Sequence, residues 1–122
     1  MAGPVRVLVV DDQAVVRSAT RSLLEATGDF EAVGEAASGV EALMAIEQLE
    51  PDLVLLDVRM PDMDGIETAE RIRAARHRPV VVLMSSDGRV EPRASSAAAF
   101  VPKERLKPAV LRDLWARYAP SP

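Results

Sequence analysis

Short apolar runs alternate along this chain with longer segments in which apolar residues recur at helical spacing. Continuous Val- and Leu-rich runs, without alternation of polar residues, are typical of strands buried on both faces of a parallel sheet. Strands are predicted at Val5–Val10, Glu31–Ala37, Leu53–Leu56, Val80–Met84 and Phe100–Val101. The second run is the least apolar, so we expect it nearer an edge of the sheet.

The segments between these runs predict helices. Gly28 supplies a stop for the first helix, Ser38 and Glu41 have the spacing of a capping box at the start of the second, and Pro108 suits the first turn of the last. The predicted helices are Ala14–Ala26, one from Ser38 that ends before Pro51, one from Asp64 through Ala75, and one from Pro108.

The first helix carries an apolar set at helical spacing, and two arginines one turn apart. We expect Arg17 and Arg21 to form a solvated face. The apolar set is Val15, Val16, Ala19, Leu23 and Leu24.

The segment Asp87–Ala97 is the weakest part of the pattern, because it contains Gly88 and Pro92 and has little apolar periodicity. A helix belongs there by alternation, but the residues favour only a short or irregular one. Five strands alternating with about five helices predict an α/β fold with a doubly wound five-stranded parallel sheet. We expect a single domain over residues 1–122, with an ordered core over about 4–119.

Composition narrows the function classes. The net charge of −4 argues against a nucleic-acid surface, which needs clustered Lys and Arg. The chain has no Cys, so disulfides and thiolate metal sites are excluded. The apolar runs are too short to span a bilayer, and no secretory signal precedes them. We therefore expect a cytoplasmic protein that binds neither membrane nor nucleic acid.

Reactive side chains follow the predicted strands at one end. Asp11 and Asp12 follow the first strand, Asp57 the third, Ser85 the fourth and Lys103 the fifth. The carboxyl ends of parallel strands meet at one edge of the sheet, where α/β proteins form their sites. Taken singly, each residue has a plain interpretation as a helix cap or a surface charge. Their joint occurrence at four strand ends predicts one site.

Clustered carboxylates repel one another unless a cation lies between them. Mg²⁺ commonly takes one or two carboxylates and binds phosphoryl oxygens, so this cluster predicts a magnesium site beside a nucleophilic Asp57. Lys103 could then stabilise a transferred phosphoryl group as a point charge, and the Ser85 hydroxyl could donate a hydrogen bond to it.

These residues resemble the receiver domain of response regulators, and the resemblance spans essentially the whole chain. It rests on an ordered series of motifs rather than on one acidic pair. The matching pieces are VLVVDDQ (Val7–Gln13), PDLVLLD (Pro51–Asp57), RMPDMDG (Arg59–Gly65) and FVPK (Phe100–Lys103). The resemblance implies the flavodoxin-like (βα)5 fold of chemotaxis-type regulators.

The resemblance also implies roles for residues. Asp57 would accept a phosphoryl group from a histidine kinase or phosphotransfer protein, and Lys103 would contact it. Asp11, Asp12, Asp57 and the backbone carbonyl of Arg59 would hold Mg²⁺. The switch residues would be Ser85 and Phe100, although Phe100 has an equal interpretation as plain core.

The sequence departs from the family pattern around the switch. Counting from Pro79 as the family usually runs puts Met84 at the hydroxyl position, and Ser85 fits only after a slip of one residue. We favour Ser85, because a thioether cannot donate a hydrogen bond to a phosphate. Glu104 stands where many members have Pro.

The leading hypothesis is a two-component phosphoacceptor that switches its interaction with a downstream partner or output domain, and that is not itself an enzyme. Self-association into a homodimer stays open. One alternative is a degenerate receiver that binds partners without phosphorylation. Another is an aspartyl-phosphate phosphohydrolase, but Arg59 stands where such enzymes place a second acid–base Asp.

Overall fold

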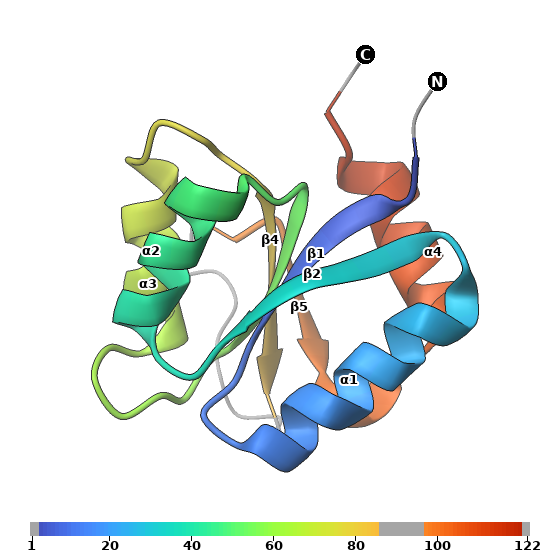
Figure 1. The fold of residues 1–122 in the computed structure, drawn as a ribbon, viewed down its shortest axis with the longest axis horizontal. Coiled ribbons are helices and arrows are strands. Elements are labelled where there is room, and N and C mark those ends of the chain that lie inside the picture. Colours follow the sequence, from blue (N-terminus) through green and yellow to red (C-terminus); the bar gives the residue numbers. More distant parts are fainter. Residues whose placement is uncertain (1–2, 86–96, 121–122) are drawn as a thin grey trace.

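The computed structural model describes residues 3–85 and 97–120, which form a single parallel sheet covered by helices on both faces (Figure 1). The strand order is β2-β1-β3-β4-β5, which confirms the predicted doubly wound fold and places the least apolar strand at an edge. The strands are β1 (Val5–Val10), β2 (Phe30–Ala36), β3 (Leu53–Asp57), β4 (Val80–Ser85) and β5 (Ala99–Pro102). The helices are α1 (Ala14–Thr27), α2 (Gly39–Leu49), α3 (Gly65–Arg73) and α4 (Pro108–Tyr118), with a 3-10 turn η2 (Lys103–Arg105) before α4.

The predicted short or irregular helix within Asp87–Ala97 falls almost wholly on residues 86–96, which lie outside the described part. Among the helices that are described, none combines the length and the apolar character that crossing a bilayer requires.

Each face of the sheet has its own apolar core, because successive side chains of a strand point to opposite faces. Leu56 packs in the core under α2 and α3, with Ile46 and Ile72 from those helices. Its neighbour Leu55 packs in the other core, with Leu24 of α1 and Leu111 of α4. Figure 1 shows the two helix pairs on either side of the sheet. This double cover explains why the central strands are almost purely aliphatic.

Helix α1 ends at Gly28 as predicted, and Gly28 adopts the left-handed conformation (φ 74°) that favours glycine. Its apolar set is only partly buried. Val15 is 78% exposed, whereas Thr20 and Leu24 are buried. Thr20 can be buried because its hydroxyl donates to the Val16 carbonyl at 2.9 Å, so the buried hydroxyl has a hydrogen-bond partner.

The predicted capping box at the start of α2 is formed in part. Ser38 Oγ accepts from the Glu41 N–H at 3.1 Å, as expected. The Glu41 carboxylate reaches back to the N–H of Ala37, at 3.1 Å, instead of that of Ser38. The box therefore ties the helix to the end of β2 (Phe30–Ala36) and fixes the entry of the chain.

Candidate metal centre

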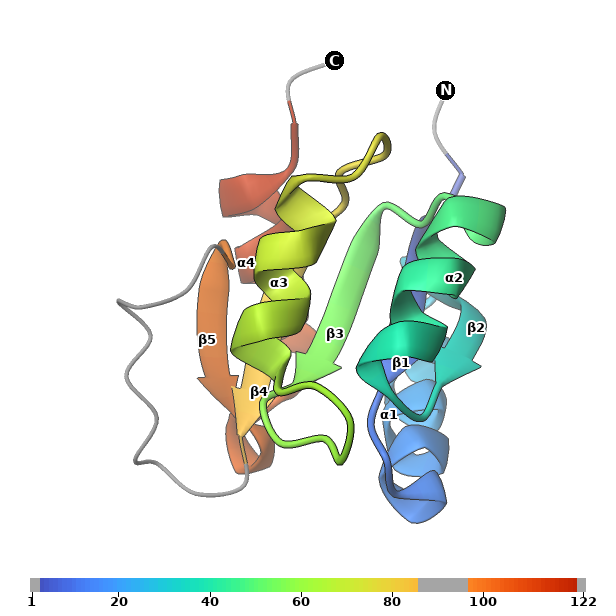
Figure 2. The ribbon, with the colours of Figure 1, turned by 90° about the vertical axis from the view of Figure 1, so that its left-hand side faces the viewer.

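The carboxyl edge of the sheet gathers the side chains that the sequence singles out. Figure 2 shows the arrowheads of β3, β4 and β5 at this common edge. Asp11 directly follows β1, Asp57 and Ser85 are the last residues of β3 and β4, and Lys103 follows β5. Carboxylate oxygens of Asp11, Asp12 and Asp57 all lie within 4.8 Å of one another. The predicted convergence of the three carboxylates is therefore present.

The register of the central strands explains why Asp11 and Asp57 meet. Val10 of β1 pairs with Leu56 of β3, so the next residue of each strand falls side by side. Asp11 is fully buried, and its N–H donates to the Ala36 carbonyl at 3.0 Å. Its carboxylate accepts from the Gln13 N–H at 2.9 Å, whereas Asp12 faces solvent. The acidic pair thus offers one fixed and one exposed carboxylate.

The backbone at Asp57 is held by close contacts on both sides. The Val58 N–H donates to the Met84 carbonyl at 2.9 Å, and the Gly65 N–H donates to the Val58 carbonyl at 2.6 Å. A Cβ on Gly65 would come within 2.5 Å of the Asp57 carbonyl oxygen and 2.7 Å of Val58 Cα. Only glycine lets α3 begin this close to the backbone of Asp57 and Val58.

Lys103 connects the two buried carboxylates. Its Nζ lies 2.6 Å from Asp11 Oδ2 and 3.4 Å from Asp57 Oδ1. The side chain is 20% exposed, so the ammonium is partly withdrawn from water and depends on these two partners.

The charges of the cluster do not balance. Burial raises the pKa of the Asp57 carboxyl, and the negative charge of Asp11 raises it further, while Lys103 and the Arg59 N–H offset part of the rise. Burial acts to lower the pKa of Lys103, but the hydrogen bond to Asp11 and the charges of Asp57 and Asp11 outweigh it, so that pKa is raised. Among the described residues, the ammonium of Lys103 contacts two of the three clustered carboxylates, and an oxygen-binding divalent cation fits this donor set.

The two candidates for the switch hydroxyl position occupy different surroundings. Ser85 is 2% exposed at the end of β4, on the same edge as Asp57. Met84 is 1% exposed and packs in the core under α1 and α4. Phe100 on β5 is half-buried against the other core, under α2 and α3. Arg59 is exposed, in the loop that follows Asp57.

One contact near the site was not predicted. The carboxylate of Asp62, in the loop after β3, accepts from the N–H groups of Gly39 and Val40 at 3.0 Å each. These hydrogen bonds lower the pKa of Asp62. The free N–H groups at the start of α2 signal that an acceptor is needed, but nothing in the sequence says that it comes from 23 residues away. This contact ties the loop that carries Arg59 to α2.

The response regulator receiver domain model matches residues 7–114 of the chain. Among solved structures, the chain is similar to the signal receiver domain of NarL from Mycobacterium tuberculosis, with 34% identity and a TM-score of 0.80 over 93% of this chain and 98% of that one. It is also similar to the response regulator domain of Thermotoga maritima CheB, with 26% identity and a TM-score of 0.81 over 98% of this chain and 99% of that one.

The curated relatives are longer proteins. A protein-glutamate methylesterase/protein-glutamine glutaminase from Nocardioides sp. is 46% identical over 82 residues, which is 67% of this chain and 22% of the relative. One from Xanthomonas oryzae pv. oryzae is 39% identical over 108 residues, or 84% of this chain and 30% of the relative. The chain thus spans about a quarter of the length of these relatives.

These relatives correct one expectation. We expected a protein that is not an enzyme, and the proteins that match it are named as enzymes. The expectation rested on a site that acts on its own Asp57, and a receiver sequence alone does not reveal what activity accompanies it in longer proteins.

Proposed function

This chain is a receiver domain of the two-component response regulator family, and from that premise we propose that Asp57 accepts a phosphoryl group with the help of bound Mg²⁺. The observation that supports the proposal is the buried Asp57 carboxylate, which has Asp11, Asp12 and Lys103 within reach. A histidine kinase or phosphotransfer protein would supply the phosphoryl group.

Each residue of the site has a separate role in the phosphoryl transfer. An oxygen of Asp57 forms the new bond to phosphorus while the bond from phosphorus to the donor breaks, and the donor leaves with that electron pair. Asp11, Asp12, Asp57 and the Arg59 carbonyl would hold Mg²⁺, which neutralises charge on the carboxylates and on the phosphoryl oxygens. Lys103 moves no proton. It contacts the incoming phosphoryl group as a fixed positive charge.

Signalling would follow from the new charge at the sheet edge. Ser85 is suited to donate to a phosphoryl oxygen on Asp57, because it ends β4 beside β3 and Met84 points into a core. Phe100, half-buried on the neighbouring strand, would change its packing in response. We propose that this change alters contact with a downstream protein or output domain. The names of the relatives favour an output of the protein-glutamate methylesterase class.

Incubation with Mg²⁺ and acetyl phosphate tests the proposal. Intact mass should show the gain of one phosphate, which chelation of the metal or the variant Asp57→Asn should abolish. The exposed residue Asp52 ends no strand, so Asp52→Asn is a matched control that should be phosphorylated as the wild type is. No phosphate gain in the wild type would contradict the proposal and favour a degenerate receiver that acts by binding alone.

A further inference from the structure

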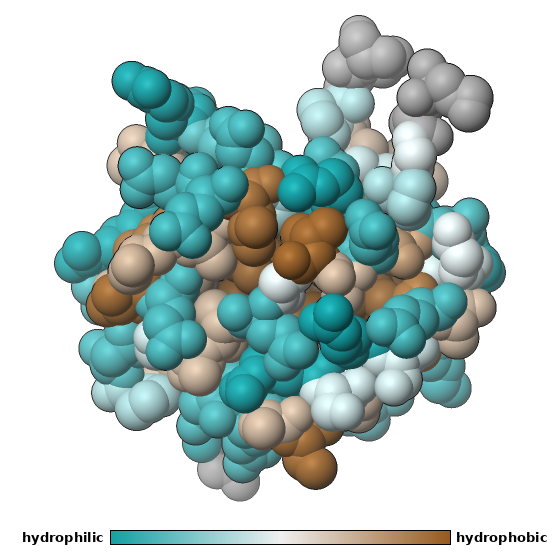
Figure 3. Space-filling view, viewed as in Figure 1, coloured by the Kyte–Doolittle hydropathy of each residue, from teal (hydrophilic) through white to brown (hydrophobic). Residues whose placement is uncertain are grey.

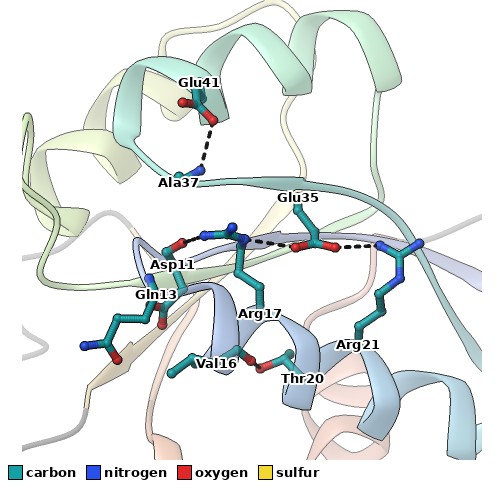
Figure 4. Close-up of polar contacts among 9 residues, drawn as sticks. All are labelled: Asp11, Gln13, Val16, Arg17, Thr20, Arg21, Glu35, Ala37 and Glu41. Atoms are coloured by element: carbon teal, nitrogen blue, oxygen red, sulfur yellow. Dashed lines mark hydrogen bonds and ion pairs between the residues drawn. The ribbon is translucent and has the colours of Figure 1, made fainter.

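Arg17 on α1 contacts the backbone of the metal site rather than solvent. Its Nη1 donates to the carbonyl oxygen of Asp11 at 2.7 Å, and its Nε donates to Glu35 Oε1 at 2.9 Å (Figure 4). The side chain is 18% exposed, which corrects the expectation of a solvated arginine. We propose that Arg17 is a positioning residue that sets the direction of the Asp12 carboxylate toward the metal. This inference rests on the proposed function, since the metal is the Mg²⁺ of that site.

Glu35 of β2 holds the guanidinium of Arg17 in place. The second oxygen of Glu35 accepts from Arg21 Nη1 at 3.0 Å, so one carboxylate joins two arginines that lie one turn apart. Figure 3 shows hydrophilic side chains between β2 and α1 on this face of the molecule. Arg17 and Arg21 of α1 bridge to Glu35 of β2, as Figure 4 shows. Arg21 is the more exposed of the two, at 41%, and its partners are Glu35 and Glu25.

The contact with Arg17 completes the fixation of Asp11. The N–H of Asp11 is bound to Ala36, and its carboxylate to the Gln13 N–H and to Lys103. Its carbonyl belongs to the same rigid peptide plane as the N–H of Asp12. By binding that carbonyl, Arg17 fixes the plane from which the exposed Asp12 side chain extends.

The positive charge of Arg17 and its hydrogen bond to the Asp11 carbonyl predict opposite changes in Mg²⁺ affinity when Arg17 is removed. A cation near the carboxylates repels Mg²⁺, so deleting its charge alone would tighten metal binding. Loss of the hydrogen bond would free the Asp11–Asp12 peptide and weaken binding, because groups that orient metal ligands are typically worth about 10- to 100-fold in affinity. The sign of the change therefore separates the two effects.

Titration calorimetry with Mg²⁺ alone tests the inference on four proteins: the wild type, Arg17→Ala, Arg17→Lys and Arg21→Ala. We expect Arg17→Ala to raise the Kd about 10-fold. Arg17→Lys should lie between the wild type and Arg17→Ala, since an ammonium can still donate to the Asp11 carbonyl but lacks the planar fork that binds Glu35 and Asp11 together. Arg21→Ala shares Glu35 but does not touch Asp11, so its Kd should match that of the wild type.

Two further measurements separate positioning from general destabilisation. In Mg²⁺-free protein the amide resonance of Asp12 should move in Arg17→Ala and not in Arg21→Ala. The Mg²⁺ concentration that gives half the maximal phosphorylation rate should rise in Arg17→Ala, while the rate at saturating Mg²⁺ stays near that of the wild type. If Arg17→Ala does not fold, the inference is tested by Arg17→Lys, whose Mg²⁺ affinity should be partly reduced.

The outcomes are distinct. Equal or tighter Mg²⁺ binding by Arg17→Ala, or equal weakening by Arg21→Ala, would overturn the positioning role and leave the proposed function standing. A wild-type protein that does not bind Mg²⁺ would instead overturn the proposed metal site, and the inference with it.

Discussion

Lys103 Nζ lies closer to Asp11 Oδ2, at 2.6 Å, than to Asp57 Oδ1, at 3.4 Å. The shorter contact thus goes to a proposed metal ligand and the longer one to the proposed phosphoacceptor. A cation bound by both carboxylates would compete with the ammonium for Asp11. The lysine therefore has two separable effects, one on metal affinity and one on phosphoryl transfer.

Replacing Lys103 should move these two effects in opposite directions. In Lys103→Met we expect tighter Mg²⁺ binding, because a competing positive charge is removed. Phosphorylation by acetyl phosphate should slow by about 100-fold, because a preorganised donor to the developing charge is lost. Calorimetry gives the affinity, and intact mass against time gives the rate.

Lys107→Met is the matched control, since Lys107 is exposed at the start of α4. It should leave both quantities unchanged. Equal rates for the wild type and Lys103→Met would remove Lys103 from the transfer step.

Asp57 makes a pH-dependent contribution to stability. Its folded-state pKa is raised, so in the pH range between 3.8 and that raised value the folded protein binds more protons at this residue than the unfolded chain does. The contribution of Asp57 to the free energy of unfolding is therefore largest below pH 3.8 and falls as the pH rises through the folded-state pKa.

The variant Asp57→Asn should consequently melt at a higher temperature than the wild type at neutral pH in Mg²⁺-free buffer. The difference in Tm should grow from acid to neutral pH and then level off. Thermal unfolding followed by circular dichroism across this range measures it. A variant that is less stable at neutral pH than at acid pH, relative to the wild type, would show that the Asp57 charge is well accommodated.

Gly65 has no room for a side chain. In Gly65→Ala the new Cβ meets backbone atoms of Asp57 and Val58, which cannot move aside as a flexible side chain would. We expect a loss of about 1–3 kcal/mol in the free energy of unfolding, typical of overpacking, and slower phosphorylation because the Asp57 backbone shifts. Urea denaturation measures the loss. Nothing lies within 4 Å of the corresponding atom at Gly3, so Gly3→Ala should be neutral.

Ser85 and Met84 can be distinguished as partners of the phosphoryl group. A hydrogen bond to a charged acceptor contributes roughly 1.5–3 kcal/mol, so Ser85→Ala should bind the phosphoryl mimic beryllium fluoride about 10-fold more weakly or worse. Met84→Leu conserves volume in the core and should bind it normally. Titration in the presence of Mg²⁺ compares the two variants. The reverse order would place Met84, and not Ser85, next to the phosphoryl group.

The fold could be predicted because each buried strand carries its own signal. Val7–Val10 and Leu53–Leu56 are aliphatic throughout since helices cover both faces of the sheet, and Gly28 and Pro108 mark helix ends by backbone chemistry alone. The position of Val15 was not predictable in the same way. Its neighbour Val16 is equally apolar, and only the docking of α1 on the sheet decides which of the two is the more exposed.

The residues that make up the site could be predicted from the strand ends, but the contacts among them could not. Parallel pairing of β1 and β3 brings Asp11 beside Asp57 by register, which the order of motifs implies. The unequal sharing of Lys103 depends on the η2 turn after β5, and the placement of Arg17 depends on its contact with Glu35 of β2, which is 18 residues away. Such contacts join residues that no local pattern connects.

The position of the acyl phosphate tests the central claim most directly. After phosphorylation with Mg²⁺, borohydride reduces an aspartyl phosphate to homoserine, and peptide mass spectrometry then identifies the modified residue. We predict homoserine at position 57 alone, in amounts that follow Mg²⁺ occupancy. Homoserine at Asp11 or Asp12, or an unmodified chain that has bound Mg²⁺, would contradict the assignment of Asp57 as the phosphoacceptor.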